Sequence, residues 1–276
     1  MLRITEAWKT FGAGTPDAMP VLGGLNLHLE RGDFVTIIGS NGAGKSTLFN
    51  AIAGSVLLDR GRISLDGEDI TWLREHRRAR SMGRLFQDPR MGTAPDLTIE
   101  ENLALVYSRG TGRPPLALAL KRKERGLFAE ALARLDMGLE TRLKVRVGAL
   151  SGGQRQALTL LLAVMIPPKL LLLDEHTAAL DPVAAKKVQA LTSEIAGGKE
   201  ILPGGRQGGP ITTLMITHSI PAALELGTRT VMMHRGRIVM DLSGGERSAL
   251  SAEELLERYR ETIREEPALE HIIPGA

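Results

Sequence analysis

The sequence has no cysteine and no long apolar run, and each absence excludes a class of protein. Without cysteine, the 276 residues can form no disulfide, thiolate metal site or cysteine nucleophile. The longest apolar stretch, residues 160–166, stops at Pro167-Pro168, far short of the ~18 residues that a membrane-spanning helix needs. The first six residues, MLRITE, lack the apolar region of a secretory signal. We therefore expect a soluble globular protein of a reducing compartment.

The chain also lacks a large excess of charge of one sign. The chain has 35 Lys and Arg against 32 Asp and Glu, a formal net charge of +3, which argues against a protein that coats nucleic acid. Aromatic residues make up 3% of the chain, and none alternate with its basic segments, as stacking on bases would need. We expect the basic segment to be a solvated helix face, with proximity to a membrane as the alternative. Its arginines are Arg74, Arg77, Arg78, Arg80 and Arg84.

Apolar runs alternate with helical patterns along the chain, which predicts an α/β fold with a helical insert. The expected strands are 25–29, 34–38, 61–66, 170–173, 211–216, 230–234 and 237–241. The expected helices are 99–107, 127–135, 155–165, 183–195 and 252–264. Residues 197–210 hold six glycines and two prolines, so we expect a surface loop there, passive or bound by a partner.

A glycine-rich segment follows the run at 34–38. Residues 39–47, GSNGAGKST, fit the phosphate-binding pattern G-x-x-x-x-G-K-[ST] between an expected strand and an expected helix. Glycines there permit unusual backbone angles and let amide N–H groups face an anion, and the helix adds its positive end. Lys45 is expected at the β and γ phosphates, Ser46 on Mg²⁺ and Thr47 at the α-phosphate. The residues expected to bind the nucleotide are Gly39, Asn41, Gly42, Gly44, Lys45, Ser46 and Thr47.

Two acidic residues end the run at 170–173. Ligands of open α/β sheets bind at the carboxyl ends of strands, so Asp174 is placed to hold Mg²⁺, directly or through water. Glu175 projects one residue further and is expected to polarise the water that attacks the γ-phosphate. The alternative, two solvated acids at a strand end, is disfavoured once the phosphate loop is counted.

A second anion-binding helix start is expected at Leu150-Ser151-Gly152-Gly153-Gln154. Ser151 is a natural N-cap, and the glycines after it leave amides exposed at the positive end of a helix. One nucleotide does not need two such sites in one chain. Two copies related by a two-fold axis resolve this, because each copy's second site would close over its partner's triphosphate. Residues 242–246, LSGGE, look similar, but we expect a turn there.

These motifs together resemble the ATP-binding cassette (ABC) family, the ATPase subunits of ABC transporters. GSNGAGKST resembles Walker A, LSGGQ the family signature and LLLLDE (170–175) Walker B. The resemblance implies a single ABC ATPase domain over 1–276, an α/β P-loop NTPase (RecA-like) core with an N-terminal antiparallel β subdomain. It places the β subdomain and core at 1–89 and 166–276, and an inserted α-helical signature subdomain at 90–165.

The resemblance also assigns roles to single residues. It implies that Phe11 stacks on adenine, although Phe11 could instead be a core residue. It makes Gln87 the Q-loop glutamine, which senses Mg²⁺ and the attacking water, with an exposed polar residue as the alternative. It makes His218 the switch histidine at the γ-phosphate, against a strand-end histidine with a structural role. Asp181 would be the D-loop aspartate, which is compatible with capping the next helix.

One residue departs from the family pattern. His176 stands where most members have proline, and it either tunes Glu175 or fills space; we favour packing. The string DEHTAALDP (174–182), with residues 92–105 and 232–238, is similar to a bacterial branch paired with branched-chain-amino-acid-type permeases.

The function implied is an ATP hydrolase that binds ATP and Mg²⁺ and drives a permease. The expected partners are a transmembrane permease, a second copy and, indirectly, a periplasmic or lipoprotein substrate-binding protein, with no nucleic acid. The resemblance places the protein at the cytoplasmic face of the inner membrane, held there by the permease, with import of an amino-acid-like solute. The alternative is a soluble non-transport ABC ATPase of DNA repair or translation. A regulator without turnover is disfavoured by Lys45, Glu175 and His218 together.

Overall fold

The computed structural model describes residues 1–111, 122–202 and 209–265. The chain divides into two compact units, which are described separately. The first comprises Met1–Arg80 and Leu214–Ala276, and the second comprises Ser81–Thr213. Among the described residues, no helix has the length and apolar character needed to cross a membrane.

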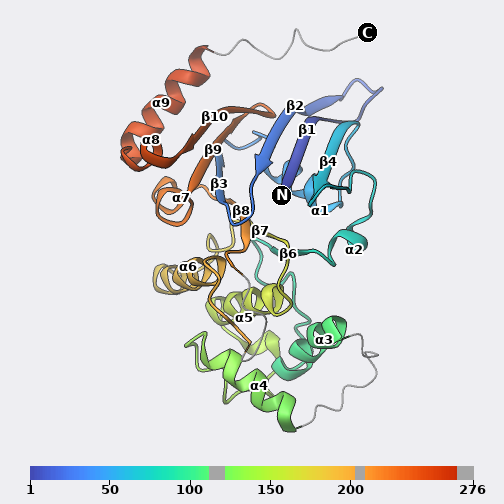
Figure 1. Cartoon of the computed structure of the whole chain (residues 1–276), viewed down its shortest axis with the longest axis vertical. Helices are drawn as coiled ribbons and strands as arrows, with labels where there is room; N and C mark the ends of the chain where they lie inside the picture. Colours follow the sequence, from blue (N-terminus) through green and yellow to red (C-terminus); the bar gives the residue numbers. More distant parts are fainter. Residues whose placement is uncertain (112–121, 203–208, 266–276) are drawn as a thin grey trace. The chain divides into compact units, whose positions relative to one another are not determined.

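An antiparallel sheet of order β2-β1-β4-β5 forms one part of the first unit (Figure 1). Leu2 of β1 lies opposite Leu29 of β2 on one side and Leu65 of β4 on the other, and all three side chains are buried. One face of this sheet is apolar and buried, as is common for antiparallel sheets. Its strands are β1 (Leu2–Phe11), β2 (Met19–Leu29), β4 (Arg60–Leu65) and β5 (Glu68–Asp69).

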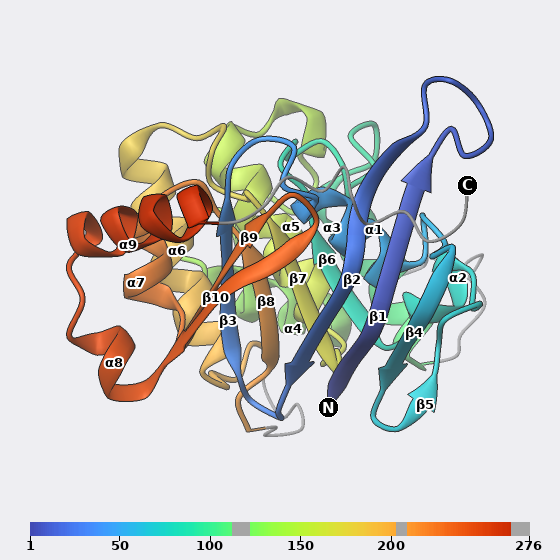
Figure 2. The same ribbon diagram turned by 90° about the horizontal axis from the view of Figure 1, so that it is seen from above.

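The other strands of the first unit follow the order β10-β9-β3-β8. Every residue of β3 is buried, which agrees with the continuous apolar run in the sequence. Helix α7 packs on β3, and α8 and α9 pack along β10 (Figure 2). The strands are β3 (Phe34–Gly39), β8 (Thr212–Ile216, whose first two residues belong to the second unit), β9 (Arg229–His234) and β10 (Arg237–Ser243). The helices of this unit are α1 (Lys45–Ala53), α2 (Glu75–Arg78), α7 (Ile220–Leu226), α8 (Gly244–Ser248) and α9 (Ala252–Glu265).

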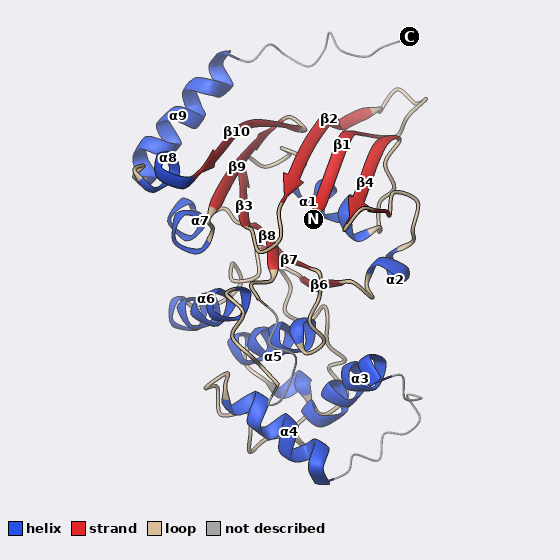
Figure 3. Cartoon of the chain, in the orientation of Figure 1, coloured by secondary structure: helices blue, strands red, loops and turns tan. Residues whose placement is uncertain are grey.

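The second unit is mainly helical (Figure 3). Its two strands, β6 (Met82–Leu85) and β7 (Leu170–Asp174), pair in parallel, with Leu85 opposite Leu173. Helix α5 contacts α3, α4 and α6, so it forms the centre of the helical packing. The helices are α3 (Ile99–Thr111), α4 (Arg122–Ala133), α5 (Gly152–Val164) and α6 (Pro182–Ala196), with a short 3₁₀ helix at Val147–Ala149.

The expectation of a solvated helix face is correct only for Arg77, which is exposed and lies in α2. Arg74 and Arg80 are exposed but lie outside α2, and the other two arginines are not exposed. Arg78 is 2% exposed, and its guanidinium donates to four carbonyl oxygens, including those of Ala51 and Ile52 at the end of α1. Arg84 lies in β6, with its guanidinium carbon 4.5 Å from the centre of the Phe86 ring. Arg78 therefore satisfies the last carbonyls of α1, a structural role for a buried cation.

Two further expectations are refined, and some elements were not expected. The turn expected at 242–246 is instead the start of the short helix α8. The loop expected at 197–210 separates α6 from β8, although its residues 203–208 lie outside the described residues. The expected ranges do not include strands β1, β5 and β6 or helix α7. Strand β5 has two residues and β6 has four, including Gly83 and Arg84, so neither gives a clear apolar pattern.

Candidate active site

The phosphate loop joins β3 to α1 in the first unit, as predicted. Gly42 and Gly44 have φ angles of 80° and 95°, a conformation that favours glycine. Helix α1 starts after Gly44 with no side-chain cap and no acidic residue in its first turn. Its first amides and its positive dipole end are therefore available to an anion.

Gly39 is glycine for a different reason from the one expected. It is the last residue of β3, and its φ does not lie in the left-handed region. A Cβ built on it would lie 2.3 Å from the carbonyl oxygen of Met233 in β9. Close approach of two backbones, rather than an unusual backbone angle, requires glycine here.

The lysine of the loop is folded onto the backbone that precedes it. Lys45 is 5% exposed, and its Nζ donates to the carbonyl oxygens of Gly39 at 2.8 Å and Ser40 at 3.0 Å. These bonds hold the ammonium group within the loop, where a triphosphate would meet it.

His218 lies at the same strand edge of the first unit as the phosphate loop. It is exposed and follows β8, whose neighbour in the sheet is β3. The amide of Thr217 donates to the carbonyl of Ile37 at 3.2 Å, so the ends of β8 and β3 lie side by side. The structure therefore brings the predicted switch histidine to the strand end from which the phosphate loop departs.

Phe11 ends β1 and is 40% exposed, so the alternative that it is a core residue is wrong. The Nζ of Lys9 lies 5.6 Å from its ring centre, and the same Nζ pairs with Asp59 at 2.6 Å. An exposed ring is what stacking on a base requires.

The predicted residues of the second unit gather at the ends of two paired strands. Asp174 is the last residue of β7, and Gln87 follows the end of β6 by two residues. Because β6 and β7 are parallel, with Leu85 opposite Leu173, Gln87 and Asp174 follow the same edge of this pair. Gln87 is exposed, and Asp174 is half-buried.

Glu175, the predicted general base, has a strained backbone. Its φ is 45°, in the left-handed region that residues other than glycine rarely adopt. Such conformations cost about 1–3 kcal/mol and concentrate at functional sites. The turn is closed by the amide of Ala178, which donates to the carbonyl of Glu175 at 2.9 Å.

His176 is buried, as the packing interpretation predicted. It is 3% exposed, and its Nε2 lies 3.0 Å from Oγ1 of Thr192 on α6. Burial lowers the pKa of His176 from 6.5 to about 4, so the ring is neutral at pH 7.

The predicted second anion site is a well-formed helix start. Ser151 caps α5, where its side chain accepts from the amide of Gln154 and the Gln154 side chain accepts from the amide of Ser151, both at 3.3 Å. The Gln154 side chain also donates to the carbonyl of Met137 and accepts from Arg142. The similar sequence at α8 differs, because Ser243 makes no side-chain cap bond.

The glycines after Ser151 pack against the segment that contains Asp181. A Cβ on Gly153 would lie 2.7 Å from Cβ of Ala184 in α6. Asp181 caps α6 as expected, since its Oδ1 accepts from the amides of Val183 at 3.1 Å and Ala184 at 3.0 Å. The starts of α5 and α6 therefore lie in direct contact within this unit.

The predicted Mg²⁺ ligands, Ser46 in the first unit and Gln87 and Asp174 in the second, are each chemically suitable. The Ser46 hydroxyl, Asp174 carboxylate and Gln87 carbonyl are hard oxygen donors, which Mg²⁺ prefers. Within the described ranges, no group of three His, Asp or Glu residues could hold a metal ion. Each of these donors suits an ion that reaches the protein with a nucleotide's phosphates, since Mg²⁺ is rarely bound by an all-protein cage.

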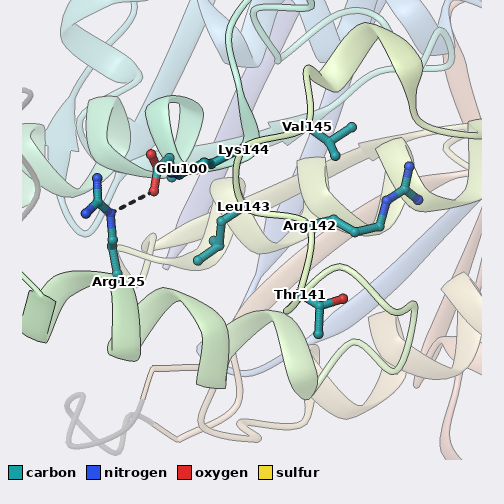
Figure 4. A pocket seen from close by; sticks show the side chains of 7 residues that line it. All are labelled: Glu100, Arg125, Thr141, Arg142, Leu143, Lys144 and Val145. Atoms are coloured by element: carbon teal, nitrogen blue, oxygen red, sulfur yellow. Dashed lines mark hydrogen bonds and ion pairs between the residues drawn. The ribbon is translucent and has the colours of Figure 1, made fainter.

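A pocket of about 310 Å³ opens in the helical part of the second unit (Figure 4). Arg125 of α4 crosses one side of it to Glu100 of α3, with a distance of 3.0 Å between Nε and Oε2. Arg142, which also lines the pocket, donates to Gln154 at 3.3 Å. The lining residues are Glu100, Arg125, Thr141, Arg142, Leu143, Lys144 and Val145.

Comparison with known proteins decides the family. The sequence profile of the family described as "ABC transporter" matches residues 22–178, more than half of the chain. The chain belongs to the ABC transporter family. It is an ATP-hydrolysing cassette with a P-loop NTPase fold, as the resemblance implied.

Relatives of this cassette include transport proteins and a solved dimer. The chain is 40% identical to the tyrosine transport ATP-binding protein of Clostridioides difficile, over 95% of this chain and 100% of that protein. It is 35% identical to the methionine import ATP-binding protein MetN of Rhizobium johnstonii, over 87% of this chain but only 60% of that longer protein. It also resembles the dimeric post-hydrolysis structure of the cassette MJ0796 bound to ADP and Pi, with a TM-score of 0.69 and 26% identity. That similarity covers 88% of this chain and 98% of MJ0796.

The sequence alone did not indicate that two residues, Arg142 and Tyr259, lie near these sites. Arg142 contacts Gln154, but it is one of several basic residues in its segment and has no local motif. Tyr259 of α9 contacts the amide of Ser40, although the two residues lie 219 positions apart. Only the amphipathic pattern of residues 252–264 pointed to a helix with a buried face there.

Proposed function

We propose that the cassette works as a pair, in which each copy completes its partner's ATP site, and that the pair drives uptake through a permease. The observation that carries this proposal is the presence of two helix starts with glycines beside them, at α1 and at α5, in one chain, each of which we infer to be an anion site. One triphosphate needs one such site, and a two-fold pair supplies the second from the other copy. The dimeric MJ0796 cassette, bound to ADP and Pi, supports this arrangement.

The proposed division of labour follows the site residues. Lys45 and the amides at the start of α1 bind the β and γ phosphates, Thr47 binds the α-phosphate, and Phe11 stacks on adenine. Glu175 accepts a proton from the attacking water, and His218 contacts the γ-phosphate. The partner's copy of residues 151–154 closes over the triphosphate, with Asp181 beside this second site.

Mg²⁺ would be held by Ser46, Asp174 and Gln87, and when bound it supplies positive charge to the phosphate oxygens. Glu175 then needs only to orient and deprotonate a water. The left-handed backbone of Glu175 supports this role, because it turns the residue away from the direction of β7.

The pair would drive transport by switching between a closed state and an open state. Contacts to the γ-phosphate stabilise the closed pair, and loss of that phosphate weakens the interface. The helical subdomain, residues 90–165, follows Gln87 directly and would carry the change to the permease. The pocket around Arg142 lies in this segment and contacts Gln154, so it is our candidate for the permease contact.

The transported solute is proposed from the relatives. The tyrosine transport protein matches nearly all of both chains, which supports an amino-acid-like solute. The permease would hold the cassette at the cytoplasmic face of the inner membrane, with a substrate-binding protein delivering the solute outside. The branch with branched-chain-amino-acid-type permeases remains a prediction from residues 92–105, 174–182 and 232–238. The alternative of a non-transport ABC ATPase is not favoured, because the relatives are transport or import proteins.

Mixing two inactive variants tests whether sites are shared. Lys45→Ala should lose most ATP binding, and Ser151→Arg should keep ATP binding but lose hydrolysis. Mixed in equal amounts, they should recover part of the phosphate release, because half of the sites in a mixed pair contain neither change. No recovery at any ratio would show that each copy has a self-contained site.

The chain offers a matched control for Ser151→Arg. Ser243 starts the look-alike helix α8 and makes no side-chain cap bond. Ser243→Arg adds the same side chain at the same sequence motif and should leave turnover unchanged. Co-purification of the cassette with a membrane complex, rather than alone, tests the transport assignment.

A further inference from the structure

The last described helix of the chain contacts the phosphate loop through one hydroxyl. Tyr259 of α9 is 8% exposed, and its Oη accepts from the backbone amide of Ser40 at 3.2 Å. The same Oη donates to the carbonyl of Met233 in β9 at 3.0 Å. The hydroxyl therefore uses both its acceptor and its donor on backbone groups.

The amide that Tyr259 binds belongs to the peptide unit that also holds the loop lysine. Ser40 N and Gly39 O are the two polar atoms of one planar peptide group. Nζ of Lys45 donates to that Gly39 oxygen at 2.8 Å. A rotation of the peptide that breaks the bond to Tyr259 also turns the carbonyl away from Lys45, so the two bonds hold one another in place.

The surroundings leave this peptide little room to move. Gly39 is so close to β9 that even a Cβ would lie 2.3 Å from the Met233 oxygen, which is also the acceptor of the Tyr259 hydroxyl. The Tyr259 ring is itself fixed in an apolar cluster. The buried members of that cluster are Ile38, Ala223, Met232, Leu242, Leu255 and Tyr259.

We propose that Tyr259 is a positioning residue for the phosphate loop, whose hydroxyl orients the Gly39–Ser40 peptide and thereby the Lys45 ammonium group. Tyr259 raises the affinity of the loop for a triphosphate without touching the nucleotide. This inference rests on the proposed function of residues 39–47 as the ATP site. It gives helix α9 a role in nucleotide binding beyond its packing on β10.

Tyr259→Phe in the full chain removes the hydroxyl and keeps the ring. We expect the Kd for the fluorescent analogue mant-ATP and the KM for ATP each to rise about 3- to 10-fold, the size of one or two lost hydrogen bonds. The kcat should stay within about twofold, because no group at the reacting phosphate is lost. A lower melting temperature with unchanged Kd and KM would mean that Tyr259 is merely structural, and would overturn the proposal.

Thr262→Val is the matched control. Thr262 lies one turn further along α9, and its hydroxyl donates to the carbonyl of Arg258 at 2.9 Å on the exposed side. Its loss should leave Kd and KM unchanged. Hydrogen exchange of a peptide covering residues 34–48 should become faster in Tyr259→Phe and not in Thr262→Val.

A second variant removes the same bond from the loop side. Ser40→Pro deletes the donor amide, so it should also raise the Kd, and adding Tyr259→Phe should cause little further rise. If each change instead raised the Kd by its full factor in the double variant, the two residues would act independently and the proposed contact would be contradicted. Lys45→Ala separates this inference from the proposed function. Wild-type binding of mant-ATP by Lys45→Ala would overturn the site itself, whereas lost binding there with normal binding by Tyr259→Phe overturns only the role of Tyr259.

Discussion

Nε2 of His176 lies 3.0 Å from Oγ1 of Thr192, and this bond ties the turn after β7 to helix α6. The Thr192 hydroxyl donates its hydrogen to the carbonyl of Val188 at 2.8 Å, so His176 must donate from Nε2. The residue before His176 is Glu175, with its left-handed backbone. The buried pair therefore fixes the chain directly after the proposed general base.

The first prediction concerns stability against pH. Above pH 6.5 the His176 ring is neutral in both the folded and the unfolded chain, so it adds no pH dependence. Below pH 6.5 the unfolded ring gains a proton that the folded ring takes up only near pH 4. The free energy of unfolding should therefore decrease as the pH is lowered from 6.5 to 4, by about 3 kcal/mol in total from this group. Urea unfolding at pH 7.5, 6 and 5 should show a smaller decrease in unfolding free energy for His176→Gln than for the wild type.

Exposed His76 of α2 provides the control for that experiment. His76→Gln should follow the wild-type dependence of unfolding free energy on pH. If His176→Gln loses stability as steeply as the wild type between pH 6.5 and pH 4, the buried ring is not the group responsible.

The second prediction links Thr192 to catalysis. Thr192→Val keeps the volume and removes the hydroxyl that accepts from His176, so the turn that presents Glu175 should loosen. We expect kcat for ATP hydrolysis to fall several-fold with little change in KM, because the triphosphate contacts are unaffected. Thr192→Ser, which restores the hydroxyl, should recover most of the rate. Equal losses in both variants would point to packing of the methyl group instead.

The third prediction tests the general base. Glu175→Gln keeps the size of the side chain but cannot accept a proton, so ATP binding should persist while phosphate release drops at least a hundredfold. The variant should accumulate as an ATP-bound dimer on size-exclusion chromatography. Glu194→Gln, an exposed carboxylate on α6 that pairs with Lys199, is the control and should hydrolyse normally. Hydrolysis at the wild-type rate by Glu175→Gln would reject the assignment.

The fourth prediction compares two glycine substitutions in helices of the second unit. Gly153→Ala would place a Cβ 2.7 Å from that of Ala184, so it should destabilise the protein by about 1–3 kcal/mol through overpacking. Gly126→Ala in α4 meets nothing within 4 Å and should stabilise it by about 0.5–1 kcal/mol. Chemical denaturation of both variants measures the difference. If both substitutions changed the free energy of unfolding in the same direction, the contact between α5 and α6 would be contradicted.

The sequence predicted the parts of this cassette that depend on local rules. Strand β3 is a continuous apolar run, Ser151 and Asp181 are residues that cap helices, and the loop before α1 follows a known pattern. It did not predict contacts between distant segments. The burial of Arg78 depends on carbonyls from residues 51, 52, 71 and 73, which converge only in the folded chain. Nothing local distinguishes that arginine from its exposed neighbour Arg77.

The bond between Tyr259 and Ser40 joins residues 219 positions apart, so it also sets an order of events during synthesis. A ribosome makes residues 39–47 early, but the hydroxyl that secures their backbone emerges only with helix α9. A nascent chain that ends after β10 has every residue of the loop and still lacks that restraint. The phosphate loop therefore gains this restraint only after α9 has been made, so the restraint cannot form while the chain is still being extended through β10.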